Sequence, residues 1–338
     1  MPKILLTIAL IFGINSVLFS QPLTWQKSFN LINGDDEGWA VCAADSSNIY
    51  VGGLTSHPGM GSVLKLNRFG EVIWQKTYED SYYITSMLSA PDGGLVYSAN
   101  SVLRMLDING NTVWSVSAPY YNSIFLTSDR FVIAPYYGSY KKYDLNGNLI
   151  WDKSISGFPV FSDGLEVNQN NYLLIGSFKH KAYLINIDSS GNLLRSKLFL
   201  NNYDAYFSSI EKLNNNIVIF GGYENGSDST KKFVLKLDQN LDSTYYLNIY
   251  TNYQYYKNKV LVNNNKIYLF YNYFNREILK ECFIIASYDT NFTFLKKTIF
   301  IPSVNWTVFN DCLLYTSNPT AVLYYRRSLL KCRRQRID

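Results

Sequence analysis

One hairpin-like pattern recurs along the sequence and constrains the fold more than any other feature. Each copy has an apolar run ending in Asp or Asn, a polar turn that usually contains Gly, and a second run with a large residue. The copies begin at Val63, Val102, Tyr140, Tyr183, Val234 and Ile284. Their turns begin at Asn67, Asp107, Asp144, Asp188, Asp238 and Asp289. These turns are 40, 37, 44, 50 and 51 residues apart, which suits a repeat of four short strands.

The turn chemistry predicts that the two runs of each copy pair with one another. An Asp side chain can accept hydrogen bonds from backbone amides further along the turn, and Asn-Gly or Ser-Gly supplies a positive φ. Trp74, Trp114 and Trp151 occupy one equivalent position on the second run, where a large ring can pack one sheet against the next. Another pair of apolar runs precedes the hairpin, as at Ile84 and Ser209. Each unit is therefore predicted to hold four antiparallel strands.

The ends of the chain suggest how these units close. A single run around Trp25 matches only the second half of the hairpin. After the sixth unit, three apolar runs follow, from Thr307, Cys312 and Ala321. Joining the N-terminal strand to these three would complete a last blade and remove exposed sheet edges. We predict an all-β fold, a seven-bladed β-propeller of four-stranded antiparallel blades over residues 21–331.

Composition and charge agree with such a fold and narrow the partners. Aromatic residues make up 16% of the 338 residues, with 29 Tyr and 20 Phe, which favours strands and excludes disorder. The formal charge of +5 resides in residues 326–338, so the rest of the chain is neutral. A neutral body lacks the basic stripe that a phosphate backbone requires, so we expect no nucleic-acid partner. We expect a monomer.

The N-terminus resembles an export signal. Residues 1–20 combine Lys3, an apolar run and the small residue Ser20, which predicts a cleaved signal peptide. An uncleaved membrane anchor is the alternative. No later run is long enough for a membrane helix, so we expect no transmembrane segment after cleavage. The product would be secreted, periplasmic or at the cell surface. Residues 332–338 form a basic tail, either a solvated end or a contact for anionic lipid or polysaccharide.

Few residues suit catalysis, a cofactor or a metal. The only histidines, His57 and His180, are expected in loops. The turns at Asp107 and Asp144 begin like EF-hand loops but lack the later Gly and Glu, so they are interpreted as turns. Seven acids are expected in connections between blades: Asp35, Asp36, Glu37, Glu79, Asp80, Asp163 and Asp204. We therefore assign no catalytic residue, no cofactor and no metal ligand.

The cysteines do not form a metal or redox motif. They are Cys42, Cys282, Cys312 and Cys332. No C-x-x-C pair and no neighbouring His is present, which excludes the usual zinc spacing. Export permits disulfides in three possible connectivities, and the first three cysteines also suit buried strand positions.

Tyrosines are enriched in segments that a propeller places on one face. These are Tyr82, Tyr83, Tyr120, Tyr121, Tyr136, Tyr137, Tyr203, Tyr206, Tyr255 and Tyr256. A tyrosine offers a rigid apolar plane with a polar tip, which suits stacking on a sugar or contact with a peptide. The alternative is that a Tyr-rich chain places Tyr everywhere.

The D-x-x-G-x-x-x-W units, the export signal and the pair Gly38–Trp39 resemble pyrroloquinoline-quinone-like and related secreted bacterial propeller repeats. The resemblance covers nearly all of residues 21–331. Dehydrogenases of that superfamily carry an adjacent Cys pair and calcium-binding acids, whereas this sequence has no adjacent cysteines. Other members are scaffolds of envelope assembly or propellers that precede a sorting domain, and no separate sorting domain follows here.

Three functions remain open from the sequence. The favoured one is a non-enzymatic extracytoplasmic propeller that binds a protein, peptide or glycan on its Tyr-rich face. The second is a propeller enzyme, either glycoside-processing or a quinone-dependent oxidoreductase, which requires acids or Arg to converge at the central channel. The third is a structural role in envelope assembly or adhesion, which requires a large protein interface.

Overall fold

The computed structural model describes most of the chain between residues 36 and 335. The described residues are 36–55, 59–100, 102–117, 123–169, 171–200, 202–224, 230–249, 258–275, 280–301, 309–314, 321–325 and 333–335. The predicted signal peptide, His57 and Cys332 lie outside them. Within this part of the chain, no helix is long and apolar enough to cross a membrane.

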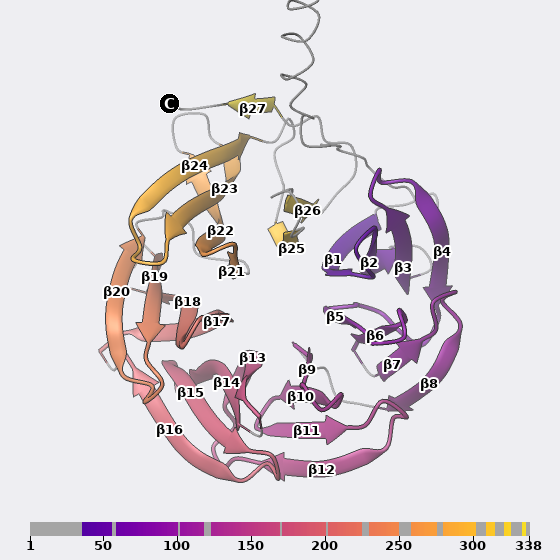
Figure 1. Cartoon of the computed structure of the whole chain (residues 1–338), viewed down its shortest axis with the longest axis horizontal. Coiled ribbons are helices and arrows are strands. Elements are labelled where there is room, and N and C mark those ends of the chain that lie inside the picture. The colour runs from indigo at the N-terminus through magenta and orange to yellow at the C-terminus, as the bar shows by residue number, and fades with distance from the viewer. Residues whose placement is uncertain are drawn as a thin grey trace, which may run out of the picture.

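Six antiparallel blades are arranged radially around a common axis (Figure 1). Blade one contains β1 (Asp36–Ala43), β2 (Asn48–Thr55), β3 (Met60–Asn67) and β4 (Val72–Tyr78). Blade two contains β5 (Ser86–Ser89), β6 (Leu95–Ser98), β7 (Val102–Leu106) and β8 (Thr112–Ser117). Blade three contains β9 (Phe125–Leu126), β10 (Val132–Tyr136), β11 (Ser139–Tyr143) and β12 (Leu149–Ser154).

The second half of the ring repeats this order. Blade four contains β13 (Val160–Asn168), β14 (Asn171–Phe178), β15 (Lys181–Asp188) and β16 (Leu193–Phe199). Blade five contains β17 (Asp204–Leu213), β18 (Asn216–Glu224), β19 (Thr230–Leu237) and β20 (Ser243–Ile249). Blade six contains β21 (Lys259–Asn263), β22 (Lys266–Asn275), β23 (Lys280–Asp289) and β24 (Phe294–Ile301). The final strands are β25 (Phe309–Leu314), β26 (Ala321–Tyr325) and β27 (Arg333–Gln335).

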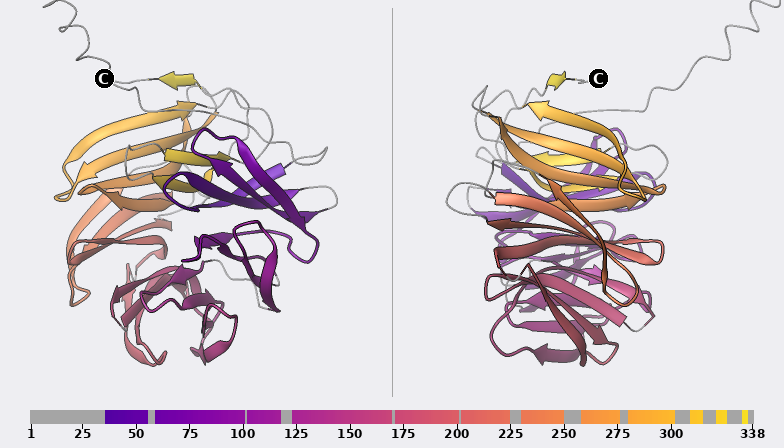
Figure 2. Two further views of the ribbon diagram at one scale, coloured as in Figure 1. Left: turned by 45° about the vertical axis from the view of Figure 1, so that its right-hand side comes forward. Right: turned by 90° about the vertical axis from the view of Figure 1, so that its left-hand side faces the viewer.

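The up-and-down order of each blade creates two distinct faces. The first strand is innermost and the fourth is outermost (Figure 1). Connections between blades therefore emerge on the same side as the turns between second and third strands. We call this side the connection face. The Asp turns between third and fourth strands lie on the opposite side, which we call the turn face. Figure 2 shows the blades side-on between these two faces.

The prediction of seven blades is wrong: the described residues form six blades, of which five have four strands and blade six gains β27 as a fifth. The runs from Thr307 and Cys312 were expected to form two strands, but Phe309–Leu314 is one continuous strand, so Asp311 is not a turn. That strand forms with β26 a two-stranded sheet that contacts β1, while β25 also contacts β21 and β22 (Figure 1). The last segment, β27, pairs with β24 in blade six instead. The expected closing strand around Trp25 lies outside the described residues.

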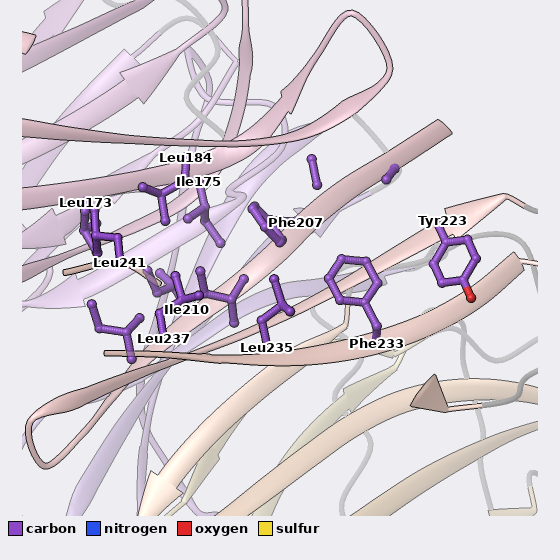
Figure 3. Packing of buried hydrophobic residues seen from close by; sticks show 14 residues of the cluster. Leu173, Ile175, Leu184, Phe207, Ile210, Tyr223, Phe233, Leu235, Leu237 and Leu241 are labelled. Carbon is purple, nitrogen blue, oxygen red and sulfur yellow. The ribbon is translucent and has the colours of Figure 1, made fainter. Parts of the chain in front are cut away.

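The hydrophobic core is divided into clusters, each shared by two consecutive blades. Figure 3 shows the cluster between blades four and five, which contains Leu173 and Ile175 from blade four and Phe207 and Phe233 from blade five. Burying a side chain of this size stabilises the fold by roughly 1.5–3 kcal/mol. No blade can cover its own faces, so each blade depends on its neighbours.

The repeated turn and tryptophan form a second contact between blades. Asp107 Oδ1 accepts the backbone amides of Asn109 at 2.9 Å and Asn111 at 2.8 Å, which fixes the turn. The hydrogen bond from the Asn111 amide lowers the pKa of Asp107, and this carboxylate is therefore occupied by its own turn. The interpretation of this segment as a turn is thus supported by its geometry.

Each tryptophan reaches the turn of the following blade. The indole nitrogens of Trp74, Trp114 and Trp151 donate to backbone carbonyls of the next turn at 3.0, 2.8 and 3.0 Å. Gly147 makes room for this contact, since a Cβ there would lie 2.8 Å from the Trp114 ring and its φ is +83°. The prediction that this repeated ring packs one sheet on the next is therefore confirmed.

Candidate functional site

Polar side chains recur at one level of the propeller axis. They lie on or just before five consecutive innermost strands, and we call them the axial belt: Ser86, Ser123, Asp163, Ser209 and Lys259. The backbone amides that follow the belt positions donate to belt side chains of the preceding blade. These bonds run from Ile124 N to Ser86 Oγ at 3.0 Å, from Ile210 N to Asp163 Oδ2 at 3.3 Å and from Val260 N to Ser209 Oγ at 3.3 Å. The belt thus links blades two to three and four to six.

Asp163 is the most heavily bonded member of the axial belt. Its Oδ1 accepts Ser123 Oγ at 2.9 Å and the Gly164 amide at 3.0 Å. Its Oδ2 accepts the Ile210 amide and lies 3.9 Å from Lys259 Nζ. A β-bulge directly before Asp163 bends β13 at this point, as a similar bulge does before Ser209. Because groups from blades three, five and six all bind this carboxylate, its role in the structure is to hold the inner strands together.

Glu211 lies two residues after Ser209 on β17 and has an unusual titration. Burial raises its pKa to about 7, with the positive charge of Lys259 opposing this effect and the negative charge of Asp163 adding to it. A carboxyl of this kind is partly ionised at neutral pH, so it can release or accept a proton there. Asp163, Glu211 and Lys259 come from three consecutive blades. Within the described residues, no three His, Cys, Asp or Glu side chains form a metal-binding group.

Replacing Glu211 by Gln should remove a pH-dependent term from stability. The folded-state pKa of about 7 lies above the ordinary value of 4.5, so the unfolded chain loses its proton first as pH rises. Glu211 therefore lowers the free energy of unfolding progressively between about pH 4.5 and pH 7. We expect Glu211→Gln to be about 1–2 kcal/mol more stable than the wild type at pH 8 but equal at pH 4.5. Urea unfolding of both proteins at both pH values measures this difference. The same difference in the free energy of unfolding at pH 4.5 and pH 8 would contradict the prediction.

Several predicted tyrosines belong to aromatic groups on the connection face. Tyr82 and Tyr83 lie between blades one and two, with ring centroids 5.0 Å apart, and Tyr83 packs edge-on against Trp39 at 5.4 Å. Tyr203 lies between blades four and five, and its ring centroid is 4.8 Å from that of Tyr223. Tyr206 is instead half-buried on β17. Tyr120, Tyr121, Tyr255 and Tyr256 lie outside the described residues.

The most exposed aromatic group contains Tyr137 and Phe158. Their rings stack with centroids 6.0 Å apart and an interplanar angle of 17°, and Tyr136 lies beside them. Tyr137 is 53% exposed and Phe158 is 67% exposed. Phe158 also has a φ of +57°, which is unfavourable for a residue with a Cβ. The chain thus holds a large apolar ring at the surface in a strained conformation, where it contributes little to the core.

The other residues considered from sequence have varied positions. His180 is exposed in the turn between β14 and β15. Of the seven acids, Asp35 lies outside the described residues. Glu79 and Asp80 lie in a connection between blades as expected, and Asp80 pairs with Arg104. Asp36, Glu37, Asp163 and Asp204 lie on innermost strands instead, so that expectation was wrong for them. Cys282 is buried on β23, whereas Cys42 is half-buried on β1.

Glu211, Lys259 and Phe158 were not identified from the sequence. Glu211 and Ser209 share one side of β17 by the two-residue period of a strand, which is a usable signal once β17 is known to be innermost. Lys259 follows a segment without a clear pattern. Nothing in the local sequence marks Phe158 as an exposed residue with positive φ.

No protein-family model and no curated protein matches this sequence. Solved structures do resemble it. Virginiamycin B lyase from Staphylococcus aureus, an inactive form with quinupristin, superposes with a TM-score of 0.61 at 10% identity and covers 90% of this chain and 98% of its own. The RRP9 WD40 repeats superpose with a TM-score of 0.59 at 9% identity, over 88% of this chain and 96% of theirs. A streptogramin B lyase superposes with a TM-score of 0.55 at 11% identity, over 81% of this chain and 93% of its own. These similarities show the β-propeller fold.

Proposed function

We propose that this protein is a secreted, non-enzymatic propeller that binds a protein, peptide or glycan partner on its connection face. The observation that supports this proposal most is the display of aromatic rings on that face, above all Tyr137 and the strained, exposed Phe158. Tyr82 and Tyr203 add further exposed rings on the same side. Flat rings with polar tips suit stacking on a sugar or packing against a peptide, and they lose little conformational entropy on binding.

The axial belt supports a rigid platform for such a face. Its hydrogen bonds join neighbouring inner strands, and Asp163 is bonded from three blades. Loops held by a rigid scaffold can present side chains in a fixed arrangement, which reduces the entropy lost on binding. The binding residues and the belt therefore have separate roles.

The triple variant Tyr82→Ala, Tyr137→Ala and Phe158→Ala should lose partner binding while remaining folded. Screening the mature protein on glycan and protein arrays identifies the partner, and the variant should then bind it at least about tenfold more weakly. The matched control is Phe69→Ala with Ile108→Ala, which removes exposed apolar side chains from the turn face. Equal affinity of the triple variant and the wild type would contradict the proposal, as would uniformly blank arrays.

The convergence of Asp163, Glu211 and Lys259 favours a second candidate, an enzyme with its site on the propeller axis. The reaction class would be glycoside processing or quinone-dependent oxidation, and Glu211 would supply the group that exchanges a proton near neutral pH. Chromogenic glycosides and dye-linked oxidation assays with added quinone test these classes. Turnover that Glu211→Gln abolishes and the triple variant retains would replace the binding proposal with this one.

A further inference from the structure

Lys232 is the most deeply buried charged residue of the described chain. It lies on β19 and is 1% exposed. Its register partner on β18 is Gly222, which in turn pairs with Tyr206 on β17. These three residues share the face of blade five that packs against blade six, because Phe220 on the same face contacts Tyr271. The ammonium group is therefore enclosed between two blades.

Lys232 is bonded to one neighbouring side chain, Asn258. Lys232 Nζ donates to Asn258 Oδ1, so the oxygen of this side chain is occupied. Asn258, 1% exposed, begins the segment that leads into β21. Its amide nitrogen has no hydrogen-bond partner within the described structure. Leaving a buried amide without a partner is costly, so such a group usually has an acceptor.

Two of the other three buried cations among the described residues, Lys142 and Arg104, pair with a carboxylate, whereas Lys65 donates to a backbone carbonyl. Lys65 Nζ donates to the Ile108 carbonyl at 3.4 Å, Lys142 lies 3.4 Å from Asp129, and Arg104 pairs with Asp80. In the described residues no carboxylate forms an ion pair with Lys232. Glu224, at the exposed end of β18, affects the pKa of Tyr206 but forms no such pair. Lys232 Nζ and Asn258 Nδ2 thus present N–H groups that no carboxylate of the described residues accepts.

We propose that the interface between blades five and six is a binding site for a small carboxylate, held by Lys232 Nζ and Asn258 Nδ2. One carboxylate oxygen accepts the ammonium group and the other accepts the side-chain amide. Tyr206 packs over Gly222, where a Cβ would lie 2.7 Å from its hydroxyl, and so closes one side of the site. The ligand is either a free organic acid or the C-terminal carboxylate of a bound peptide, since both carry this group.

Protonation of Lys232 sets the expected pH dependence. Burial lowers its pKa to about 7, and no neighbouring charge contributes to that shift. The titratable groups on this side of the interface are Tyr206 on β17 and Tyr271 in blade six. Neither ionises below pH 9, because burial raises the pKa of both. A carboxylate binds the protonated lysine, so affinity should weaken about tenfold per pH unit above pH 7.

The test uses acetate as the probe and acetamide as its neutral match. Thermal unfolding and lysine ¹⁵Nζ NMR of the full chain are recorded at pH 6 and pH 8, at constant ionic strength in chloride. We expect acetate to raise the melting temperature saturably and to raise the Lys232 pKa, with weaker binding at pH 8. Lys232→Met should abolish both effects, whereas Lys65→Met, which removes another buried lysine, should retain the acetate effect. N-acetyl-triglycine and its amide distinguish a peptide carboxylate from a free acid.

Three results would overturn the site. The first is a rise in melting temperature with acetamide or chloride alone that equals the rise with acetate. The second is an acetate effect that persists in Lys232→Met. The third is the absence of a saturable acetate effect at both pH values. In the last case the Asn258 amide is satisfied by water alone. None of these results depends on partner binding to the connection face, so this site and the proposed function can fail independently.

Discussion

Replacing Trp114 with alanine is expected to lower the free energy of unfolding by about 3 kcal/mol, the largest effect that we expect from any single change. The ring packs on Gly147 of blade three, and its indole nitrogen donates to the Leu145 carbonyl at 2.8 Å. Alanine would remove both the apolar contact and the hydrogen bond, leaving that carbonyl without its partner between blades. Equilibrium urea unfolding of the variant and the wild type measures the difference.

The neighbouring residue provides the matched control. Val113 lies on the same strand and is 56% exposed, so Val113→Ala should change the free energy of unfolding by no more than about 0.5 kcal/mol. If both variants lost similar amounts, the loss would reflect the outer strand in general and the contact between Trp114 and the next turn would not matter.

Replacing Lys232 with methionine is expected to stabilise the protein by about 1–3 kcal/mol at pH 7. The folded-state pKa of about 7 lies below the ordinary value of 10.5, so the unfolded chain takes up the proton first as pH falls. The wild type therefore loses stability from about pH 10.5 down to pH 7, and the cost stays constant below that. Methionine fills a similar volume without a charge, although it leaves Asn258 Oδ1 without a donor.

The sign of this effect is best measured by its pH dependence. Without added carboxylate, the stability advantage of Lys232→Met should be greatest at pH 7 and should shrink by pH 9.5. Lys65→Met serves as a comparison, because the negative charge of Asp45 partly offsets the effect of burial on the pKa of Lys65, and its removal should therefore stabilise the protein less. A Lys232→Met variant that is less stable than the wild type at pH 7 would show that the buried ammonium group is compensated.

The repeating part of the fold could be predicted from the sequence because its signals are local. Asp107, Gly110 and Trp114 determine a turn and a contact within eight residues, and the same spacing recurs at Asp144. Four strands per blade follow from the apolar runs around these turns. The number of blades could not be predicted in this way, since it depends on how the last runs pair. Phe309–Leu314 is one strand, where the runs from Thr307 and Cys312 were expected to be two.

The candidate sites were harder to predict because they combine residues from different blades. Asp163 meets Ser123 and Lys259 only through the radial arrangement of innermost strands. Lys232 lies on a strand of the repeat, yet its environment depends on Asn258 of the following blade. Even Tyr137, which was predicted to lie on the connection face, stacks on Phe158, a residue without any sequence signal.

The contact between Trp114 and the next turn has a consequence for how such proteins can change in length. Each of the first three units supplies a tryptophan to the turn of the next unit, so a duplicated unit inserted among them could use the existing contacts on both sides. Gain or loss of a whole unit therefore requires new interactions only at the junction of the two ends. That junction is where β25 lies between β1 and β21.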